Sequence, residues 1–592
     1  MAKNVKKSGT HVDRRRFLKG VAATGAVGAV AAVHPASARQ STGQSATTTK
    51  SWRDKPDSID ESLISDGGTY DVVVVGGGNA GSICASAASQ KGASVAVIEN
   101  QAEKSYTPGA GKEIGIINSQ YALSQGAPRI NEDEFLQEWA RRNVIRHNPK
   151  RASYFVKNSG RILDWVLSFA DKKWIDENCH IMSCPPKPTV LLEVSGWKFF
   201  YGSAIFLNKN ETSGRETWPE LQKVHRERAL ARGAKWFFQH HAEICDVDGS
   251  GAVTGVIAKT ADNKYVRFKA RKGVALCAGD FSGNREMVVE ILDQLRHEAE
   301  AKGDLNLIRA GGGFGGLTRD GSGIKLGIWA GGHIEIGPRS TMGGGDPGTG
   351  VWFLQLDGNG ERFYDEAAGT TVLQPKDDFT VTFFDSNWRK VLEMMPPRHG
   401  AVDTADATSW PPTLSQLDDV KPGPQKYSWK RDRFLRWGLQ GDLYCANTFE
   451  DLLNYAACYK GQTRKKASAA IARYNEMCKK GMDEDFGKDR RIMKATELKD
   501  APFYASVNKG GGAGMMMGGG GISAGMVSTT GLDTDADGCV LNSEFKPIKG
   551  LYAAGNNAGG RYIVVYQTPL SGLSIGMAIT EGCMLGEKLA AS

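Results

Sequence analysis

The chain has 592 residues, of which 40% are apolar and 24% charged, so it can bury a large core and exceeds a usual single domain by about three to four times. Its formal charge is +8, but residues 1–38 hold seven Lys or Arg and one Asp, which leaves about +2 for the rest. This distribution argues against nucleic acid as a partner.

The N-terminal segment, residues 1–38, predicts a signal peptide of the twin-arginine type. Asp13 and the run Arg14–Arg16 are followed by the weakly apolar GVAATGAVGAVAAV and an A-x-A cleavage site. A short amphipathic or membrane helix is the alternative, but a membrane span needs about 20 strongly apolar residues. Because the twin-arginine route carries folded proteins, we expect a tightly bound cofactor and a location in the periplasm or at the extracytoplasmic cell surface. Residues 39–67 are expected to form a linker.

A dinucleotide-binding motif follows the linker. The run Val72–Val75 predicts a strand buried on both faces, and Gly76, Gly78 and Gly81 then fit G-x-G-x-x-G. The first glycine permits a tight turn, the second lets a pyrophosphate approach the backbone, and the third lets the helix pack closely on the strand. A second apolar run ends at Glu99, 23 residues after Gly76, where a carboxylate is expected to accept hydrogen bonds from a ribose.

The ten cysteines do not predict a metal or haem site. No C-x-x-C-H and no four-cysteine spacing of an iron–sulfur protein is present. Cys179, His180 and Cys184 could ligate a metal or simply pack in a core, and we predict no metal site. The sequence leaves the existence of disulfides open.

The C-terminal part indicates which dinucleotide to expect. It contains IKGLYAAGNNAGG and GLSIGMAITEGCMLGEKLAA, and the middle of the chain contains, in order, KGVALCAGDFSGNREMV, TRDGSGIKLGIWAGG and LQLDGNGERFYDE. Together these segments resemble the flavoprotein subunit of the fumarate reductase and succinate dehydrogenase family, especially its soluble exported members and their 3-oxosteroid dehydrogenase relatives.

The resemblance implies an α/β fold with noncovalently bound FAD. A Rossmann-like FAD domain with the two-dinucleotide-binding fold would occupy residues 68–334 and 506–592, and an inserted α+β capping domain would occupy residues 335–505. The residues implied for FAD binding are Gly76, Gly78, Ala80, Gly81, Glu99, Gly115, Ala278, Gly279, Asp320, Gly555, Asn556, Ser574 and Ile575.

The dicarboxylate-binding residues that the resemblance implies are replaced in this chain. Members of the fumarate type bind their substrate with His and Arg side chains. At the matching positions this chain has Thr370, Val527 or Ser528, the PRST segment with Arg339, and Thr568 or Pro569. The neighbouring segment RYIVVYQTPLSGLS supplies Arg561, Tyr562 and Tyr566 as catalytic candidates. The two tyrosines could instead be ordinary wall or core aromatics.

These observations predict an exported FAD-dependent reductase of an activated carbon–carbon double bond in an apolar or aromatic small molecule. Hydride would come from flavin N5 and a proton from a protein acid. Electrons would come from a separate donor: a cytochrome, a flavin-carrying protein or a quinol-linked membrane protein. One alternative is a dehydrogenase of the 3-oxosteroid type, which introduces a double bond next to a ketone. Another is a binding protein that keeps the fold without catalysis.

Overall fold

The computed structural model describes residues 51–109, 111–210, 215–309, 318–339, 352–367, 379–397, 417–428, 441–509, 522–523, 527–564 and 566–592. All of them belong to one compact unit, Ser51–Ser592. The predicted signal peptide, the first part of the predicted linker and Thr370 lie outside the described residues. Within them, no helix combines the length and apolar character needed to cross a membrane.

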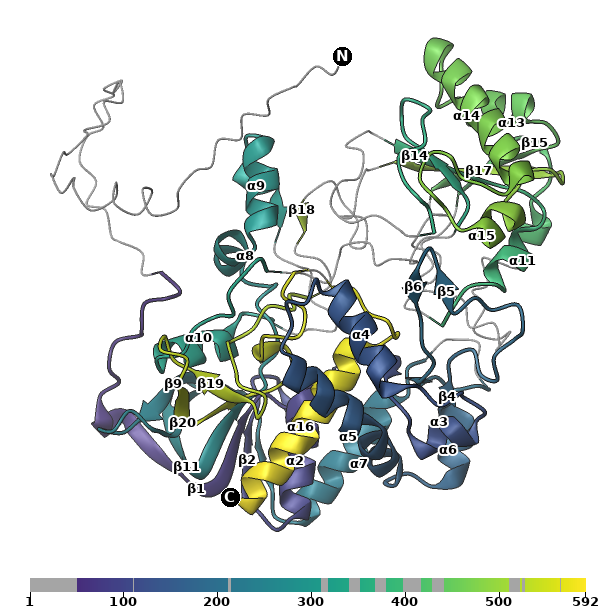
Figure 1. Ribbon diagram of the computed structural model, residues 1–592. Helices are drawn as coiled ribbons and strands as arrows, with labels where there is room; N and C mark the ends of the chain where they lie inside the picture. Colours follow the sequence, from purple (N-terminus) through teal and green to yellow (C-terminus); the bar gives the residue numbers. More distant parts are fainter. Residues whose placement is uncertain are drawn as a thin grey trace, which may run out of the picture. The chain divides into compact units, whose positions relative to one another are not determined.

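An eight-stranded sheet, built from strands of both the N-terminal and the C-terminal parts of the chain, forms the centre of the larger part of the structure (Figure 1). Its order is β19 (Cys539–Leu541), β20 (Pro547–Ala553), β11 (Tyr265–Leu276), β1 (Ile64–Val75), β2 (Val95–Ile98) and β8 (Lys235–Phe237), and β10 (Val253–Thr260) and β9 (His240–Val247) branch from β11. The five strands from β20 to β8 run parallel. Val72 to Val75 are at most 2% exposed, which confirms the predicted strand with two buried faces.

Small residues let two helices approach each other beside this sheet. Helix α2 (Asn79–Gln90) follows β1, and the C-terminal α16 (Leu573–Ala591) runs beside it (Figure 1). A Cβ at Gly582 would lie 2.2 Å from the Ala80 carbonyl oxygen, and one at Gly586 would lie 2.3 Å from that of Cys84. Larger side chains at these positions would push the two helices apart.

The remaining elements of the predicted FAD-binding part lie around the sheet. They are η1 (Glu61–Leu63), η2 (Glu103–Ser105), β3 (Glu113–Gly115), α3 (Gln120–Ser124), α4 (Glu132–Arg142), α5 (Pro149–Leu167), α6 (Lys172–Asn178), β4 (His180–Ile181), β7 (Ser203–Ile205), α7 (Trp218–Ala231), α8 (Arg285–Ile291), α9 (Asp293–Ala301), η3 (Leu305–Leu307), β12 (Ile308–Arg309), α10 (Ser322–Trp329), β18 (Ile522–Ser523) and η7 (Gly555–Asn557).

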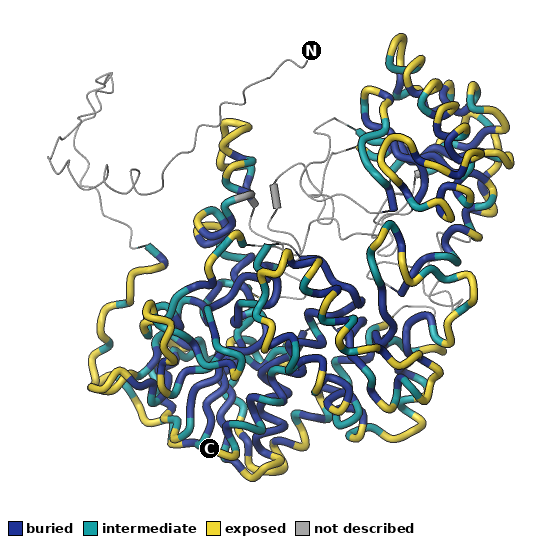
Figure 2. Tube along the Cα trace, viewed as in Figure 1, coloured by how far each residue is buried: buried dark blue, intermediate teal, exposed yellow. Residues whose placement is uncertain are grey.

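The cap is an α+β unit with an antiparallel five-stranded sheet. The sheet order is β13 (Leu354–Leu356), β14 (Phe379–Phe384), β17 (Phe503–Lys509), β16 (Asp442–Ala446) and β15 (Gly423–Ser428). Its helices are α11 (Trp388–Leu392), α13 (Phe449–Ala456), α14 (Gly461–Lys480) and α15 (Arg490–Ala495), with the short η5 (Leu417–Asp419). Figure 2 shows a buried interior in this unit beneath helices whose outer faces are exposed.

The structure revises three predicted boundaries. The boundary at residue 505 falls inside β17, which pairs with β14 as far as Lys509. The described part of the predicted linker belongs to the unit built on the eight-stranded sheet, because Trp52 is 5% exposed in its core and β1 already begins at Ile64. The hairpin of β5 (Glu193–Val194) and β6 (Trp197–Lys198) lies in the predicted first FAD segment, yet Val194 and Phe199 pack with cap residues.

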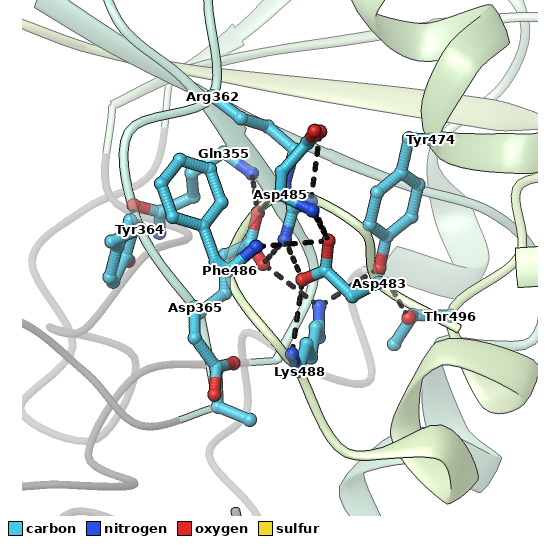
Figure 3. Close-up of polar contacts among 12 residues, drawn as sticks. Gln355, Arg362, Tyr364, Asp365, Tyr474, Asp483, Asp485, Phe486, Lys488 and Thr496 are labelled. Carbon is cyan, nitrogen blue, oxygen red and sulfur yellow. Dashed lines mark hydrogen bonds and ion pairs between the residues drawn. The ribbon is translucent and has the colours of Figure 1, made fainter. Parts of the chain in front are cut away.

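A buried charge network holds the middle of the cap together (Figure 3). The Arg362 guanidinium donates to both oxygens of Glu366, at 3.0 and 2.9 Å, and to both oxygens of Asp483, at 2.9 and 3.0 Å. Lys488 Nζ lies 3.1 Å from Glu366 and 2.9 Å from the Tyr474 hydroxyl. Burial alone would raise the pKa of Glu366, but Lys488 and Arg362 outweigh it and lower that pKa.

Candidate active site

The loop between β1 and α2 has the open space that a pyrophosphate requires. A Cβ at Gly76 would lie 2.7 Å from Ala278 Cα, and a Cβ at Gly81 would lie 1.9 Å from the Gly76 carbonyl oxygen, so the packing of the chain on itself requires these two glycines. At Gly78 the nearest atom would be the Pro108 carbonyl oxygen, 3.5 Å away. No side chain caps the N-terminus of α2, which is the arrangement that favours a bound phosphate.

Glu99 lies at the end of β2, directly beside this loop. Its carboxylate is 6% exposed and accepts hydrogen bonds from the backbone N–H of Gly77 at 2.8 Å and of Gln101 at 2.9 Å. The Tyr106 hydroxyl donates to the Gly77 carbonyl at 2.5 Å, and burial, with the charge of Glu99, raises the pKa of Tyr106. Glu99 therefore fixes the glycine loop, and ribose binding stays a prediction for the same carboxylate.

Asn557 joins the ends of two parallel strands at the site. Its side-chain oxygen accepts from Ala278 N–H at 2.6 Å, and its amide donates to the Gly279 carbonyl at 2.7 Å. Gly279 has φ +85° and no atom within 4 Å of the position of a Cβ, so its surroundings are open. Asn557 was missed in the sequence, although an amide inside AGNNAGG at the carboxyl end of a strand is a usable signal.

A buried ion pair holds η7 in place from α5 and α16. Arg151 Nε donates to Glu581 at 2.7 Å, and Arg151 Nη1 donates to the Gly559 carbonyl at 2.8 Å. The second oxygen of Glu581 accepts from the Gly555 N–H at 3.1 Å. A Cβ at Gly555 would lie 3.1 Å from that of Ala80, so the predicted residues Gly555 and Ala80 are neighbours. No local motif in the sequence marks Arg151 or Glu581.

Gly115 supports the first turn of α16. Its N–H donates to the Gly572 carbonyl at 2.9 Å, and a Cβ at Gly576 would lie 1.8 Å from the Gly115 carbonyl oxygen. Gly572 has φ +67°, and no side chain caps the helix that it precedes. Ile575, in the first turn, packs against a hydrophobic cluster. The structure therefore gives Gly115 a close-packing role beside a helix N-terminus that can face an electron-rich ligand.

Arg561 brings two of the predicted FAD-binding residues together. Its side chain is almost completely buried, with the residue 1% exposed. It donates from Nη2 to Asn556 Oδ1 at 2.6 Å, from Nη1 to Ser574 Oγ at 3.4 Å and from Nε to the Ala558 carbonyl at 3.3 Å. Arg561 thus connects η7 with the first turn of α16.

Tyr562 and Tyr566 lie in an aromatic cluster beside α16. Their ring centroids are 4.8 Å apart, and that of Tyr562 lies 6.2 Å from Trp139 on α4. Tyr562 is fully buried with its hydroxyl 3.7 Å from the Met577 sulfur, and Tyr566 is 8% exposed. These contacts place Tyr562 in the packing of the cluster, and its catalytic role and that of Tyr566 stay predictions.

Asp320 differs from the other predicted FAD-binding residues in its surroundings. One carboxylate oxygen accepts from the Ser322 N–H at 2.9 Å, and the other lies 3.0 Å from His241 Nε2 on β9. Hydrogen bonds with Asp320 and Glu243 raise the pKa of His241 to about 9. Burial alone would raise the pKa of Asp320, but the His241 hydrogen bond and its other contacts hold it low. The Asp320 carboxylate is therefore engaged with a protein cation, and FAD binding by it stays a prediction.

The residues that stand where dicarboxylate-binding side chains were expected make contacts within the protein itself. Arg142 donates to the Thr568 carbonyl at 3.1 Å, and the Phe200 N–H donates to that of Pro569 at 3.0 Å. Ser528 is fully buried, and Arg339 donates to the Glu335 carbonyl at 3.3 Å. Cys179 is buried in a hydrophobic cluster, and the described cysteines form no disulfide.

The glycine loop, the uncapped helix N-termini and the open surroundings of Gly78 and Gly279 fit a bound dinucleotide. The sequence pattern described as the FAD binding domain matches residues 71–573. The chain belongs to the FAD binding domain family. This flavoprotein therefore has FAD as its cofactor, as the sequence predicted.

Curated relatives and solved structures agree with that family. The flavoprotein is 23% identical over 555 residues to the vinyl phenol reductase of Lactiplantibacillus plantarum, covering 87% of this chain and 95% of the relative. It is 23% identical over 542 residues to the fumarate reductase (cytochrome) of Shewanella frigidimarina, covering 88% and 77%.

Among solved structures, a 3-ketosteroid-Δ4-(5α)-dehydrogenase from Rhodococcus jostii RHA1 matches with a TM-score of 0.60 at 17% identity, covering 89% of this chain and 98% of that one. A flavocytochrome c3 fumarate reductase in its open conformation matches with a TM-score of 0.54 at 17% identity, covering 92% and 82%. The predicted α/β FAD fold and the class of fumarate-reductase-like FAD oxidoreductases are confirmed.

Proposed function

We propose that this flavoprotein reduces a carbon–carbon double bond conjugated to an aromatic ring in a small molecule. The observation that carries the proposal is the aromatic cluster against the first turns of α16. It contains Phe135, Trp139, Phe155, Phe200, Tyr562 and Tyr566. The proposal places the substrate beside this cluster, where a ring gains apolar burial and ring contacts, whereas a dicarboxylate loses hydration without gaining a cation.

The curated relatives support the same substrate class. The relative that aligns over 95% of its length is named a vinyl phenol reductase, which places a double bond next to a phenol ring in its substrate. The fumarate reductase is equally similar, at 23% identity. The replacement of the predicted carboxylate ligands by Thr568 or Pro569 and by Val527 or Ser528 favours the aromatic substrate over fumarate for this chain.

Bound FAD would supply a hydride to the outer carbon of the double bond. The residues Gly78, Glu99, Asn556 and Ser574 would hold the cofactor, and the buried aromatic walls would exclude water from the reacting carbons. Tyr566 is the proposed proton donor, because its side chain is slightly exposed and its phenol hydroxyl is a hydrogen-bond and proton donor.

We further propose that the electrons come from a separate donor protein and that the chain works outside the cytoplasm. The proposals for a cytochrome, a flavin-carrying protein or a quinol-linked membrane protein remain equal candidates. The twin-arginine motif of residues 1–38 supports the export proposal.

An anaerobic assay with reduced methyl viologen tests the proposal. We expect oxidation of the viologen with 4-vinylphenol and little with acrylate or fumarate, and product analysis should find the ethyl phenol. Faster turnover with fumarate than with any styrene-type substrate would overturn the aromatic assignment. Oxidation of a 3-oxosteroid with an artificial acceptor, without viologen-dependent reduction, would favour the dehydrogenase alternative. Purified protein without flavin absorbance would favour the binding protein.

A further inference from the structure

Arg561 differs from the other buried arginines of the described structure in lacking a carboxylate partner. Arg142, Arg151 and Arg362 are each at most 5% exposed at the side chain, and each lies within 2.7 to 2.9 Å of a carboxylate oxygen. Arg561 is equally buried, but its hydrogen bonds go to Asn556, Ser574 and the Ala558 carbonyl, all neutral acceptors. Among the described residues, no carboxylate oxygen lies within 4.0 Å of its guanidinium.

A buried guanidinium without a counter-ion is unfavourable unless a ligand supplies negative charge. Arg561 acts electrostatically on the carboxyl group of Glu335 and opposes the rise in its pKa, but Glu335 makes no hydrogen bond to Arg561 among the described contacts. One of its oxygens accepts from the Gly560 N–H, and the other is buried without a hydrogen-bond partner in the described structure. Burial raises the pKa of Glu335 to about 7, so at neutral pH this group does not fully cancel the charge of Arg561.

The place of Arg561 indicates which part of FAD supplies the charge. FAD carries negative charge on its pyrophosphate at all times, and on its ring system after two-electron reduction. The pyrophosphate already has the glycine loop and the uncapped N-terminus of α2. Arg561 instead reaches the first turn of α16, a 19-residue helix whose N-terminus also has no side-chain cap. The guanidinium and the helix terminus add two positive contributions at one place.

We propose that Arg561 is a fixed counter-ion for the reduced flavin ring and raises the reduction potential of the bound FAD. Asn556 and Ser574 orient the guanidinium, so its charge is held in place before reduction takes place. A cation in this position stabilises the two-electron reduced form relative to the oxidised form, which makes the flavin easier to reduce by a weak donor. The proposal concerns the cofactor and is independent of the substrate proposed above.

Spectroelectrochemical titration of the holoprotein tests this role without substrate. In Arg561→Gln the preference for the reduced form should fall at least tenfold, which corresponds to a midpoint potential lower by about 30 mV for a two-electron couple. Arg561→Lys keeps the charge and should retain most of the potential. Sulfite gives a second readout, because it adds to the oxidised ring and leaves negative charge there. Its dissociation constant should rise at least tenfold in Arg561→Gln and stay within about threefold in Arg561→Lys.

A matched variant covers the case in which Arg561→Gln does not bind FAD. Asn556→Asp is nearly isosteric, keeps Arg561 and introduces a carboxylate at the acceptor 2.6 Å from Nη2, so it should lower the potential and weaken sulfite binding in the same direction. Potentials within about 10 mV of wild type in both Arg561→Gln and Asn556→Asp would overturn the proposal. Weaker FAD binding by Arg561→Gln with an unchanged potential would also overturn it, and would assign Arg561 to the pyrophosphate.

Discussion

Arg151 and Glu581 form a buried ion pair across 430 residues of sequence, and Glu581 in turn accepts the N–H of Gly555. The turn that presents Gly555 and Asn556 is therefore held by two helices, α5 and α16, rather than by its own sequence. Positioning of this kind fixes the conformation of the turn before a ligand arrives.

A bulky residue at position 78 should remove the cofactor without unfolding the protein. The side chain of Gly78→Leu would enter the open space in front of α2, where only the Pro108 carbonyl oxygen comes within 3.5 Å of a Cβ, and would occupy the pyrophosphate position. We expect colourless protein with an unchanged circular dichroism spectrum. Gly249→Leu, at an exposed glycine with no atom within 4 Å, is the control and should stay yellow. Full flavin absorbance in Gly78→Leu would show that the pyrophosphate binds elsewhere.

Removal of the Tyr566 hydroxyl should slow the chemical step. Tyr566→Phe keeps the ring in the aromatic cluster, so FAD content should be preserved, while loss of an acid typically costs about 10²-fold or more. Stopped-flow oxidation of the reduced flavin by 4-vinylphenol isolates that step. Tyr562→Phe is the matched control, because its hydroxyl lies beside the Met577 sulfur, and it should have a small effect. A Tyr566→Phe rate within about threefold of wild type would leave Tyr566 as part of the aromatic wall.

Fumarate should be a poor substrate for this protein. Its two carboxylates would lose hydration against the aromatic cluster, and a polar mismatch of this kind typically costs several kcal/mol, about 10²-fold or more in kcat/KM. Steady-state rates with reduced viologen, fumarate and 4-vinylphenol at equal enzyme concentration give the comparison. Comparable kcat/KM values for the two substrates would contradict the prediction.

Glu335 should make the protein less stable as the pH rises from about 4.5 to about 7. Burial raises its folded pKa to about 7 from the ordinary 4.5. The hydrogen bond from the Gly560 N–H and the charge of Arg561 lower this pKa in part, and the charge of Asp533 raises it slightly. In that window the unfolded chain releases the proton while the folded chain keeps it, so stability falls and the loss is complete above pH 7.

The size of this effect is on the order of 3 kcal/mol, at about 1.4 kcal/mol per pKa unit. Denaturant unfolding of wild type and Glu335→Gln at pH 5 and pH 8 measures it. The variant, which cannot ionise, should gain stability relative to wild type between the two pH values. An equal difference at both pH values would show that Glu335 does not titrate in this range.

Breaking the charge network of the cap should be costly. Arg362→Met leaves Glu366 and Asp483 buried without their shared cation, which typically costs about 3–5 kcal/mol. Denaturant unfolding monitored by tryptophan fluorescence should show the loss. Arg473→Met, which removes a half-exposed partner of Asp485 in the same cap, should cost about 1 kcal/mol or less. Similar losses in the two variants would contradict a special role for the buried network.

The sequence predicted those parts of the site that local geometry determines. Gly76, Gly78, Gly81 and Glu99 follow from one strand, one turn and the end of the next strand, and the structure connects them as expected. Asn557 was missed because its partners Ala278 and Gly279 are nearly 280 residues away, a pairing that no local pattern specifies.

The end of the cap was missed for a related reason. β17 is assigned to the cap by its pairing with β14, and the composition of residues 506–509 does not distinguish one sheet from the other. The absence of a carboxylate partner for Arg561 among the described residues is also a property of the assembled fold, since nearby sequence says nothing about which carboxylates lie within reach.

The hairpin of β5 and β6 limits how the cap can be exchanged between related proteins. Val194 and Phe199 fill the cap core beside Trp352 and Trp388, and the Ser195 hydroxyl donates to Asp365 at 2.7 Å. A cap made of residues 352–509 alone would therefore lack these side chains and have a cavity in its core. A cap taken from a relative would have to pack against a hairpin whose side chains fit a different core. A working chimaera would have to carry residues 187–199 along with the cap. The two segments therefore have to be exchanged together, although about 150 residues of sequence separate them.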